Sequence, residues 1–259
     1  MRKTFVGCVL ALAVALPAAG QSLTVPLVPG VLGDLTVSFG GVTGLSLSNL
    51  GVTIQLVSPL DPGLRARLPQ TVSIPFGLSL LVRIQPPASG GLSFTGVTEV
   101  ELHTLIAPSS PRMYAASSER DPFEDITSSN VSYGSSYRVI GTRGGFSEFL
   151  IVSDRTPTAT VVAAKLDRLD RILAGNAGAI AAGVRADLAA QLSALRGHVE
   201  SGQTAAAIQD VDLFLATVTQ HSGPEIPNVW RAARDLVNVA GLLGAGGETL
   251  RFSLQQLGQ

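Results

Sequence analysis

The sequence predicts an α+β protein in which an N-terminal antiparallel β-sandwich is followed by a C-terminal four-helix bundle. Three observations predict this fold. Up to about residue 155, short runs of Val, Ile, Leu, Thr and Ser are separated by Gly and Pro clusters, which is typical of many short strands. After Arg155, Ala becomes dominant and apolar residues recur at steps of three and four, which is typical of amphipathic helices. Strands without helical crossovers favour two packed antiparallel sheets over a parallel sheet.

The composition excludes several classes of protein. Of the 259 residues, 46% are apolar, which is enough for a sizeable core, and 14% are charged, compared with about 25% in average domains. The formal net charge of −1 excludes a strongly basic nucleic-acid binder and a polybasic membrane binder. The chain has one cysteine, Cys8, so an internal disulfide framework and a zinc site built on thiolates are excluded.

Residues 1–20 have the layout of a secretory signal peptide. Arg2 and Lys3 precede an apolar run at 5–16, and small residues follow up to Gly20. We expect cleavage after Gly20, which removes Cys8, and a secreted or periplasmic mature protein that is not inserted in a membrane. The alternatives are a buried N-terminal helix and a lipoprotein modified at Cys8. The run is shorter than the roughly 20 apolar residues that a membrane anchor needs.

Ten strands are expected in residues 21–155, which we assign to the β-sandwich domain. Gly144-Gly145 lies between two of the strongest strands and predicts a β-hairpin there. The expected strands are residues 23–28, 34–39, 44–48, 52–58, 71–74, 78–84, 97–105, 113–116, 137–142 and 146–153.

Four helices are expected in residues 156–259, which we assign to the helical bundle domain. Thr156 before Pro157 is typical of a helix start. The fourth helix is expected to begin near Pro227 and to carry Trp230 on its apolar face, as part of the core. Residues 248–257 fit either a last helical turn or a strand. The apolar faces of the four helices are Val162, Leu166, Leu169 and Leu173; Val184, Leu188, Leu192, Leu195 and Val199; Ile208, Val211, Leu215 and Val218; and Trp230, Ala233, Val237 and Ala240.

Two stretches resemble known modules. Residues 137–154 (YRVIGTRGGFSEFLIVSD), preceded by FEDIT at 123–127, are similar to the closing hairpin of β-sandwich modules in exported bacterial proteins. The helical part resembles FIMAH, a small module appended to extracellular bacterial proteins, at Leu169, Leu173, Leu188, Leu192, Leu195, Gly202, Ala205 to Ala207, Phe214, Val218, Ile226, Ala233, Leu236 and Ala240. Together the halves resemble a family of uncharacterised exported bacterial proteins. The resemblance implies this architecture and carries over no catalytic residue.

Two carboxylates give the best enzyme hypothesis. Glu99 and Glu101 are expected on the solvent face of strand 97–105 with His103, while Val100 and Leu102 face the core. The two carboxylates would be about 7 Å apart from the rise of a strand, which is within the range for an acid/base pair in glycoside hydrolysis. A solvated strand face has the same alternation by default, and we prefer that interpretation.

Other chemistry has weaker support. His103, His198 and His221 are far apart and lack the spacing of metal ligands, and no GxSxG nucleophile motif, P-loop or dinucleotide-binding glycine motif is present. An acidic loop at 119–125 could bind calcium through several carboxylate oxygens, although a solvated loop is the simpler explanation. Its acidic residues are Glu119, Asp121, Glu124 and Asp125.

The sequence therefore predicts no catalytic, cofactor-binding or metal-binding residue, and no cofactor. We expect an exported, non-catalytic structural or interaction protein with an unknown protein or cell-envelope partner and no nucleic-acid partner. The alternatives are a carbohydrate- or calcium-dependent binding module and a glycosidase-like enzyme that uses paired carboxylates.

Overall fold

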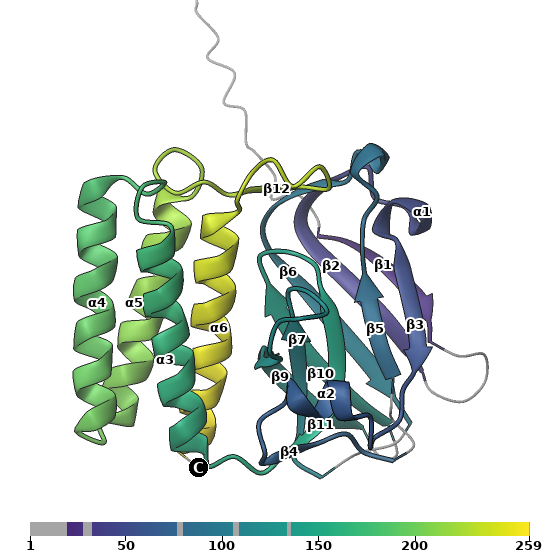
Figure 1. Cartoon of the computed structure of the whole chain (residues 1–259). Helices are drawn as coiled ribbons and strands as arrows, with labels where there is room; N and C mark the ends of the chain where they lie inside the picture. Colours follow the sequence, from purple (N-terminus) through teal and green to yellow (C-terminus); the bar gives the residue numbers. More distant parts are fainter. Residues whose placement is uncertain (1–19, 28–32, 77–79, 106–108, 134–135, 259) are drawn as a thin grey trace, which may run out of the picture.

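Two antiparallel sheets form a sandwich, and four helices form a bundle beside it, in the computed structural model of the chain (Figure 1). The structure describes residues 20–27, 33–76, 80–105, 109–133 and 136–258. The predicted signal peptide, apart from Gly20, and Cys8 lie outside the described residues. The predicted α+β fold, a β-sandwich followed by four helices, is confirmed.

The first sheet carries the face on which the bundle packs. Its strands, in spatial order, are β1 (Gln21–Pro26), β2 (Asp34–Thr43), β6 (Ser93–Thr104), β10 (Ser136–Arg143) and β9 (Thr127–Tyr133), with β12 (Val229–Arg231) also paired to β6. All these pairs are antiparallel. In β6 the side chains alternate as the sequence predicts, because Val100 and Leu102 are buried while Glu99 and Glu101 lie on the opposite face.

The second sheet lies on the other side of the main core. Its strands, in spatial order, are β3 (Val52–Leu56), β5 (Leu80–Ile84), β11 (Glu148–Asp154), β7 (Pro111–Ala116) and β8 (Glu124–Asp125), with β4 (Val72–Ser73) also paired to β11. The short helices α1 (Leu47–Leu50) and α2 (Pro62–Ala66) and the 3-10 turn η1 (Ala88–Gly90) lie in its connections. Leu64 of α2 packs with Leu81, Tyr114 and Leu150, so the second sheet is buried on both faces there.

Two predictions about the strands are wrong. Residues 44–48 form no strand, because Ser46 Oγ accepts a hydrogen bond from the Asn49 N–H and starts α1, which Gly51 ends at φ 62°. β9 was not expected, because its sequence TSSNVSY has one aliphatic residue, Val131. Such a polar segment gives little apolar alternation, although it pairs along β10.

The hairpin expected at Gly144-Gly145 is also wrong. β10 belongs to the first sheet and β11 to the second, so the two glycines connect the sheets. Close packing explains the glycines better than a hairpin turn. A Cβ on Gly144 would lie 2.4 Å from the backbone N of Leu242, and one on Gly145 would lie 3.2 Å from Trp230 Nε1.

The bundle consists of α3 (Thr158–Gly175), α4 (Ala182–Glu200), α5 (Thr204–His221) and α6 (Val239–Leu257). The first three confirm the predicted helices and most of their predicted apolar faces, but in α5 Phe214 is buried in the core and Leu215 is only partly buried. Phe214 and Leu188 are fully buried in a single cluster with residues from all four helices. In the described part of the chain, no helix is long and apolar enough to span a membrane.

The fourth helix begins later than the sequence predicts. Asn238 caps it, since its Oδ1 accepts a hydrogen bond of 2.9 Å from the Gly241 N–H, and residues 248–257 are helical. Trp230 therefore lies on β12 and not on a helix. Its ring stacks on Phe94 at 5.0 Å between centroids and meets Phe146 edge-on at 5.1 Å, so Trp230 is partly buried and packs against the sandwich core.

The bundle contacts the sandwich through α6 and α3. α6, the yellow helix nearest the sandwich in Figure 1, packs on β6, β9 and β10 of the first sheet. Asn238 Nδ2 donates hydrogen bonds to the carbonyl of Gly96 at 2.6 Å and of Gly144 at 3.1 Å. From α3, Lys165 Nζ lies 3.0 Å from a carboxylate oxygen of Asp125, and both side chains are buried.

Candidate functional site

A cavity opens where three strands of the second sheet end. The chain leaves β5 and β7 at this end and enters β11 there, and the loop from β12 to α6 closes one side. The cavity measures about 420 Å³, within the range of small-molecule sites. Its lining is Ile84, Gln85, Ser117, Ser118, Glu119, Arg120, Phe146, Ser147, Glu148 and Arg234.

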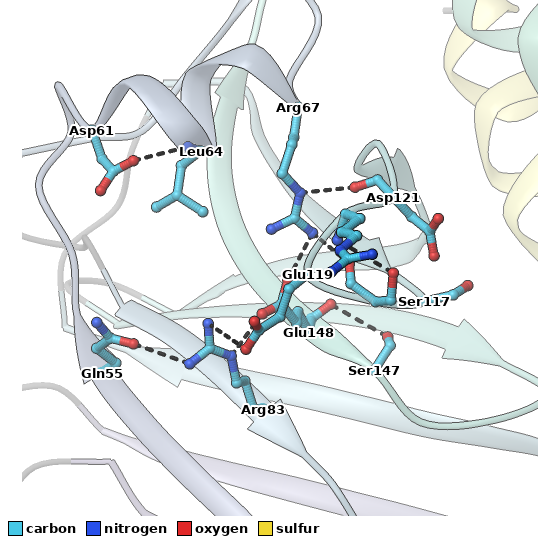
Figure 2. A network of polar contacts seen from close by, with 12 residues as sticks. Gln55, Asp61, Leu64, Arg67, Arg83, Ser117, Glu119, Asp121, Ser147 and Glu148 are labelled. Carbon is cyan, nitrogen blue, oxygen red and sulfur yellow. Dashed lines mark hydrogen bonds and ion pairs between the residues drawn. The ribbon is translucent and has the colours of Figure 1, made fainter.

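A buried carboxylate at the cavity is held by two arginines (Figure 2). Glu148 is 2% exposed and lies directly opposite Arg83 on the neighbouring strand. Arg83 Nε donates to one carboxylate oxygen at 2.6 Å, and an Arg67 nitrogen donates to the other at 2.7 Å. Arg83 also lies 3.4 Å from Glu119. Because charge-assisted bonds occupy both oxygens of Glu148, the carboxylate is fixed in place.

Arg67 also fixes the loop that forms the wall of the cavity. Asp61 caps α2 by accepting a hydrogen bond from the Leu64 N–H. Arg67 follows the last residue of this short helix and lies over the sheet. Arg67 then donates to the carbonyl oxygens of Asp121 at 2.8 Å and Ser118 at 2.8 Å. One guanidinium thus ties α2, the 117–121 loop and β11 together.

A second buried arginine lies behind two hydroxyls of this cavity. Arg143 is 6% exposed, and its guanidinium donates to Ser147 Oγ at 2.8 Å and Ser117 Oγ at 3.0 Å. Among the described residues, no carboxylate lies within 4 Å of its nitrogen atoms. Burial lowers the pKa of Arg143 to about 9, with Arg168 adding to the effect. Arg143 also lines a neighbouring cavity of about 250 Å³.

Three acidic residues of the 119–125 loop form ion pairs with three different basic residues. Glu119 pairs with Arg83, Glu124 lies 3.1 Å from Arg168, and Asp125 pairs with Lys165. Within the ranges that the structure describes, no group of three or more His, Cys, Asp or Glu is arranged to hold a metal ion. The calcium hypothesis therefore has no ligand cluster in this loop to support it.

The predicted Glu99 and Glu101 pair is divided between two surroundings. Glu101 forms an ion pair with Arg138 of β10. Glu99 instead lines a cavity of about 400 Å³ between the first sheet, α5 and α6, together with Glu248. Burial raises the pKa of Glu99, as does Glu101. Burial also raises the pKa of Glu248, as does Glu99, while Thr142 and Arg251 oppose the rise.

The structure predicts a pH-dependent stability from Glu248. A carboxyl with a raised pKa in the folded state stabilises the fold at low pH, and this contribution is lost as pH rises from about 4.5 through the folded-state pKa. Glu248→Gln should therefore raise the melting temperature by a few degrees at pH 7.5. The two proteins should converge below about pH 4. Thermal unfolding from pH 4 to 8, with exposed Glu200→Gln as control, measures this; a difference that does not change with pH would contradict it.

The three histidines lie apart and each has an acidic partner. His103 Nδ1 is 3.1 Å from Asp34, His198 Nδ1 is 2.5 Å from Asp210, and His221 pairs with Glu225. The structure thus brings none of them into one site. Each fixes a local contact between or within elements.

The residues that build the cavity were not identified in the sequence. Arg83 and Glu148 stand within the apolar segments LLVRI and FSEFLIV, and a charge inside a buried strand is a signal for a buried ion pair. Arg143 is likewise a charged residue at the end of a buried strand, although its partners are serine hydroxyls and not a carboxylate. Arg67 gives none, because its role depends on how α2 folds back over the sheet.

One comparison with known proteins covers nearly the whole chain. The model of a family of unknown function, DUF6689, matches residues 5–258. No curated protein matches the chain. The match includes both the sandwich and the bundle, with the strands and loops that form the cavity. The chain therefore belongs to the DUF6689 family of unknown function.

Proposed function

We propose that the protein is an exported, non-catalytic interaction protein, whose sandwich binds a ligand in the cavity at the ends of β5, β7 and β11. We further propose that it is a bacterial cell-envelope or secreted protein and that its helical part is a FIMAH-like module. The basic and apolar pattern of residues 1–20 supports export. The leucine spacing of the helices supports the FIMAH-like module.

One observation carries the binding function. The cavity is large enough for a small molecule, while its buried carboxylate, Glu148, is locked between Arg67 and Arg83. A general base must be free to take a proton in the reaction. A carboxylate that two guanidinium groups hold is suited to keeping the cavity in shape, and the hydroxyls and arginines around it are suited to binding.

A second candidate function comes from the cavity between the first sheet, α5 and α6. Glu99 and Glu248 line it together, and their raised pKa values favour a protonated carboxyl, as a general acid requires. In the glycosidase-like alternative, the two carboxylates are then Glu99 and Glu248, because Glu101 is paired with Arg138. The site would lie between sheet and bundle.

The two functions differ in what happens to a ligand. We expect saccharides or organic acids that raise the melting temperature of residues 21–259 to be recovered unchanged by mass spectrometry. Product formation that Glu99→Gln and Glu248→Gln each abolish would support the enzyme and contradict the non-catalytic proposal. Glu200→Gln serves as the exposed control.

Export has its own test. The full chain, expressed in a bacterium with an outer membrane, should be recovered from the periplasm or medium with an N-terminus at or near Gln21. Edman sequencing or intact mass measures this. Exported material that keeps Met1 would contradict the predicted cleavage.

A further inference from the structure

We propose that the cavity at the ends of β5, β7 and β11 binds the oxyanion of a small ligand, a carboxylate, sulfate or phosphate group, through Ser117, Arg120 and Arg234, with Arg143 behind. This site rests on the proposed binding function and names its ligand class. Four steps carry it, from the buried charge outward to the open side of the cavity.

The first step is the uncompensated charge of Arg143. A buried guanidinium is normally paired with a carboxylate, because the cost of removing a charge from water is high. Arg143 is buried and donates to two neutral hydroxyls, and Glu124 and Asp121 act on it only from a distance. Glu124 is itself held by Arg168 and Arg171. The charge of Arg143 is thus left available to an anion.

The second step concerns the hydrogen bonds of the two serine hydroxyls that accept from Arg143. Ser147 Oγ accepts from Arg143 and donates to the Glu148 carbonyl at 3.3 Å. Ser117 Oγ also accepts from Arg143, and within the described ranges no acceptor takes its own hydrogen. Ser117 is exposed and lines the cavity, so it can donate that hydrogen to a ligand oxygen. Its bond from a cation makes it a stronger donor.

The third step is the charge at the rim. Arg120 lines the cavity from the loop after β7, and Arg234 lines it from the loop between β12 and α6. Both are exposed, and neither forms an ion pair with a described carboxylate. Arg234 is held at φ 56°, a left-handed conformation that is uncommon for a residue other than glycine. The network and rim together hold Arg67, Arg83, Arg120, Arg143 and Arg234 against the three carboxylates of Glu119, Asp121 and Glu148. This surplus of positive charge attracts an anion.

The fourth step is the size and lining of the space. The cavity volume of about 420 Å³ exceeds what an inorganic ion needs. Phe146 forms an apolar wall that this cavity shares with the neighbouring cavity of about 250 Å³. An organic anion fits better than a free ion, with its oxyanion at Ser117 and its body against Phe146. Guanidinium groups bind carboxylate, sulfate and phosphate with the same fork geometry.

Isothermal titration calorimetry of residues 21–259 tests the site. The titrated probes are glucuronate, phosphate and sulfate at constant ionic strength, with glucose as a neutral probe. We expect saturable binding of at least one anion, tightest for glucuronate, and none of glucose. Ser117→Ala, and separately Arg120→Ala with Arg234→Asn, should each weaken it by about tenfold or more. Asn tolerates the left-handed conformation at position 234.

The control removes a positive charge elsewhere. Arg155→Ala, beyond the far end of β11, takes away one exposed arginine and should leave the affinity unchanged. An Arg143→Gln variant that folds should lose binding. If this variant does not fold, Ser117→Ala tests the same hydrogen bond between Arg143 and Ser117 at an exposed residue. No saturable anion binding, or equal losses in Arg155→Ala, would overturn the proposal. Binding of glucose or another neutral ligand without anion binding would overturn it and leave the proposed function standing.

Discussion

Replacing Phe214 with alanine is expected to lower the free energy of unfolding by about 3–5 kcal/mol, the usual range for a buried phenylalanine. Phe214 has no exposed surface, and α5 carries it into the core of the bundle. A Cβ on Gly247 of α6 would lie 3.5 Å from its ring, so α6 packs closely on it. Because most of the stability of a helix in a protein comes from the packing of its apolar face, the bundle depends on such contacts.

Leu213 is a matched control for this prediction. It precedes Phe214 on the same helix and is 55% exposed, so Leu213→Ala should change stability by less than about 0.5 kcal/mol. Urea denaturation of residues 21–259, followed by circular dichroism, compares the two. Equal and small changes in midpoint would show that Phe214 does not face the core and would contradict the packing.

Removing Lys165 is expected to destabilise the protein by about 3–5 kcal/mol, because the change leaves a buried carboxylate without its cation. Lys165 Nζ lies 3.0 Å from Asp125 and donates to the Thr249 carbonyl at 3.0 Å, so it joins α3 to α6 and to the sandwich. Burial lowers the pKa of Lys165, while Asp125 opposes the shift. Lys165→Met keeps the length of the side chain and removes the charge.

A double variant separates charge from packing in this contact. Asp125 Oδ1 accepts hydrogen bonds from the N–H and hydroxyl of Thr127, at 2.8 and 2.6 Å, and an asparagine at 125 can keep them. Lys165→Met with Asp125→Asn should therefore recover most of the loss in a denaturation experiment. A double variant as unstable as Lys165→Met alone would show that the loss came from packing.

The helices could be predicted well because their signals are local. In α3, α4 and α5, apolar residues at steps of three and four coincide with the buried face, and the helices end at Gly175, Glu200 and His221. The same rule failed at residues 227–238. There Trp230 and Val237 mimic a helical spacing, but β12 pairs with a strand more than a hundred residues earlier. Pairing with a distant strand leaves no local periodicity to read.

The candidate site escaped prediction for a related reason. Its charged groups come from the residue after α2, from β5, the 117–121 loop, the end of β10, β11 and the loop before α6, so no short motif contains them. Sequence spacing did predict which face of β6 carries Glu99 and Glu101. Their partners, Glu248 and Arg138, depend on how α6 and β10 dock. The division into a sandwich domain at residues 21–155 and a bundle domain at residues 156–259 stays a prediction.

The position of β12 also has a consequence for the order of folding. Ser93 Oγ donates to the Trp230 carbonyl, and Asn238 to the Gly96 carbonyl, across 137 and 142 positions of the chain. Contacts between such distant segments close large loops and slow the folding of a domain. During synthesis, the sandwich can acquire its last strand and its tryptophan only when nearly all of the protein has been made. Until then, Phe94 and Phe146 lack the ring that packs on them, so the core of the sandwich is completed late.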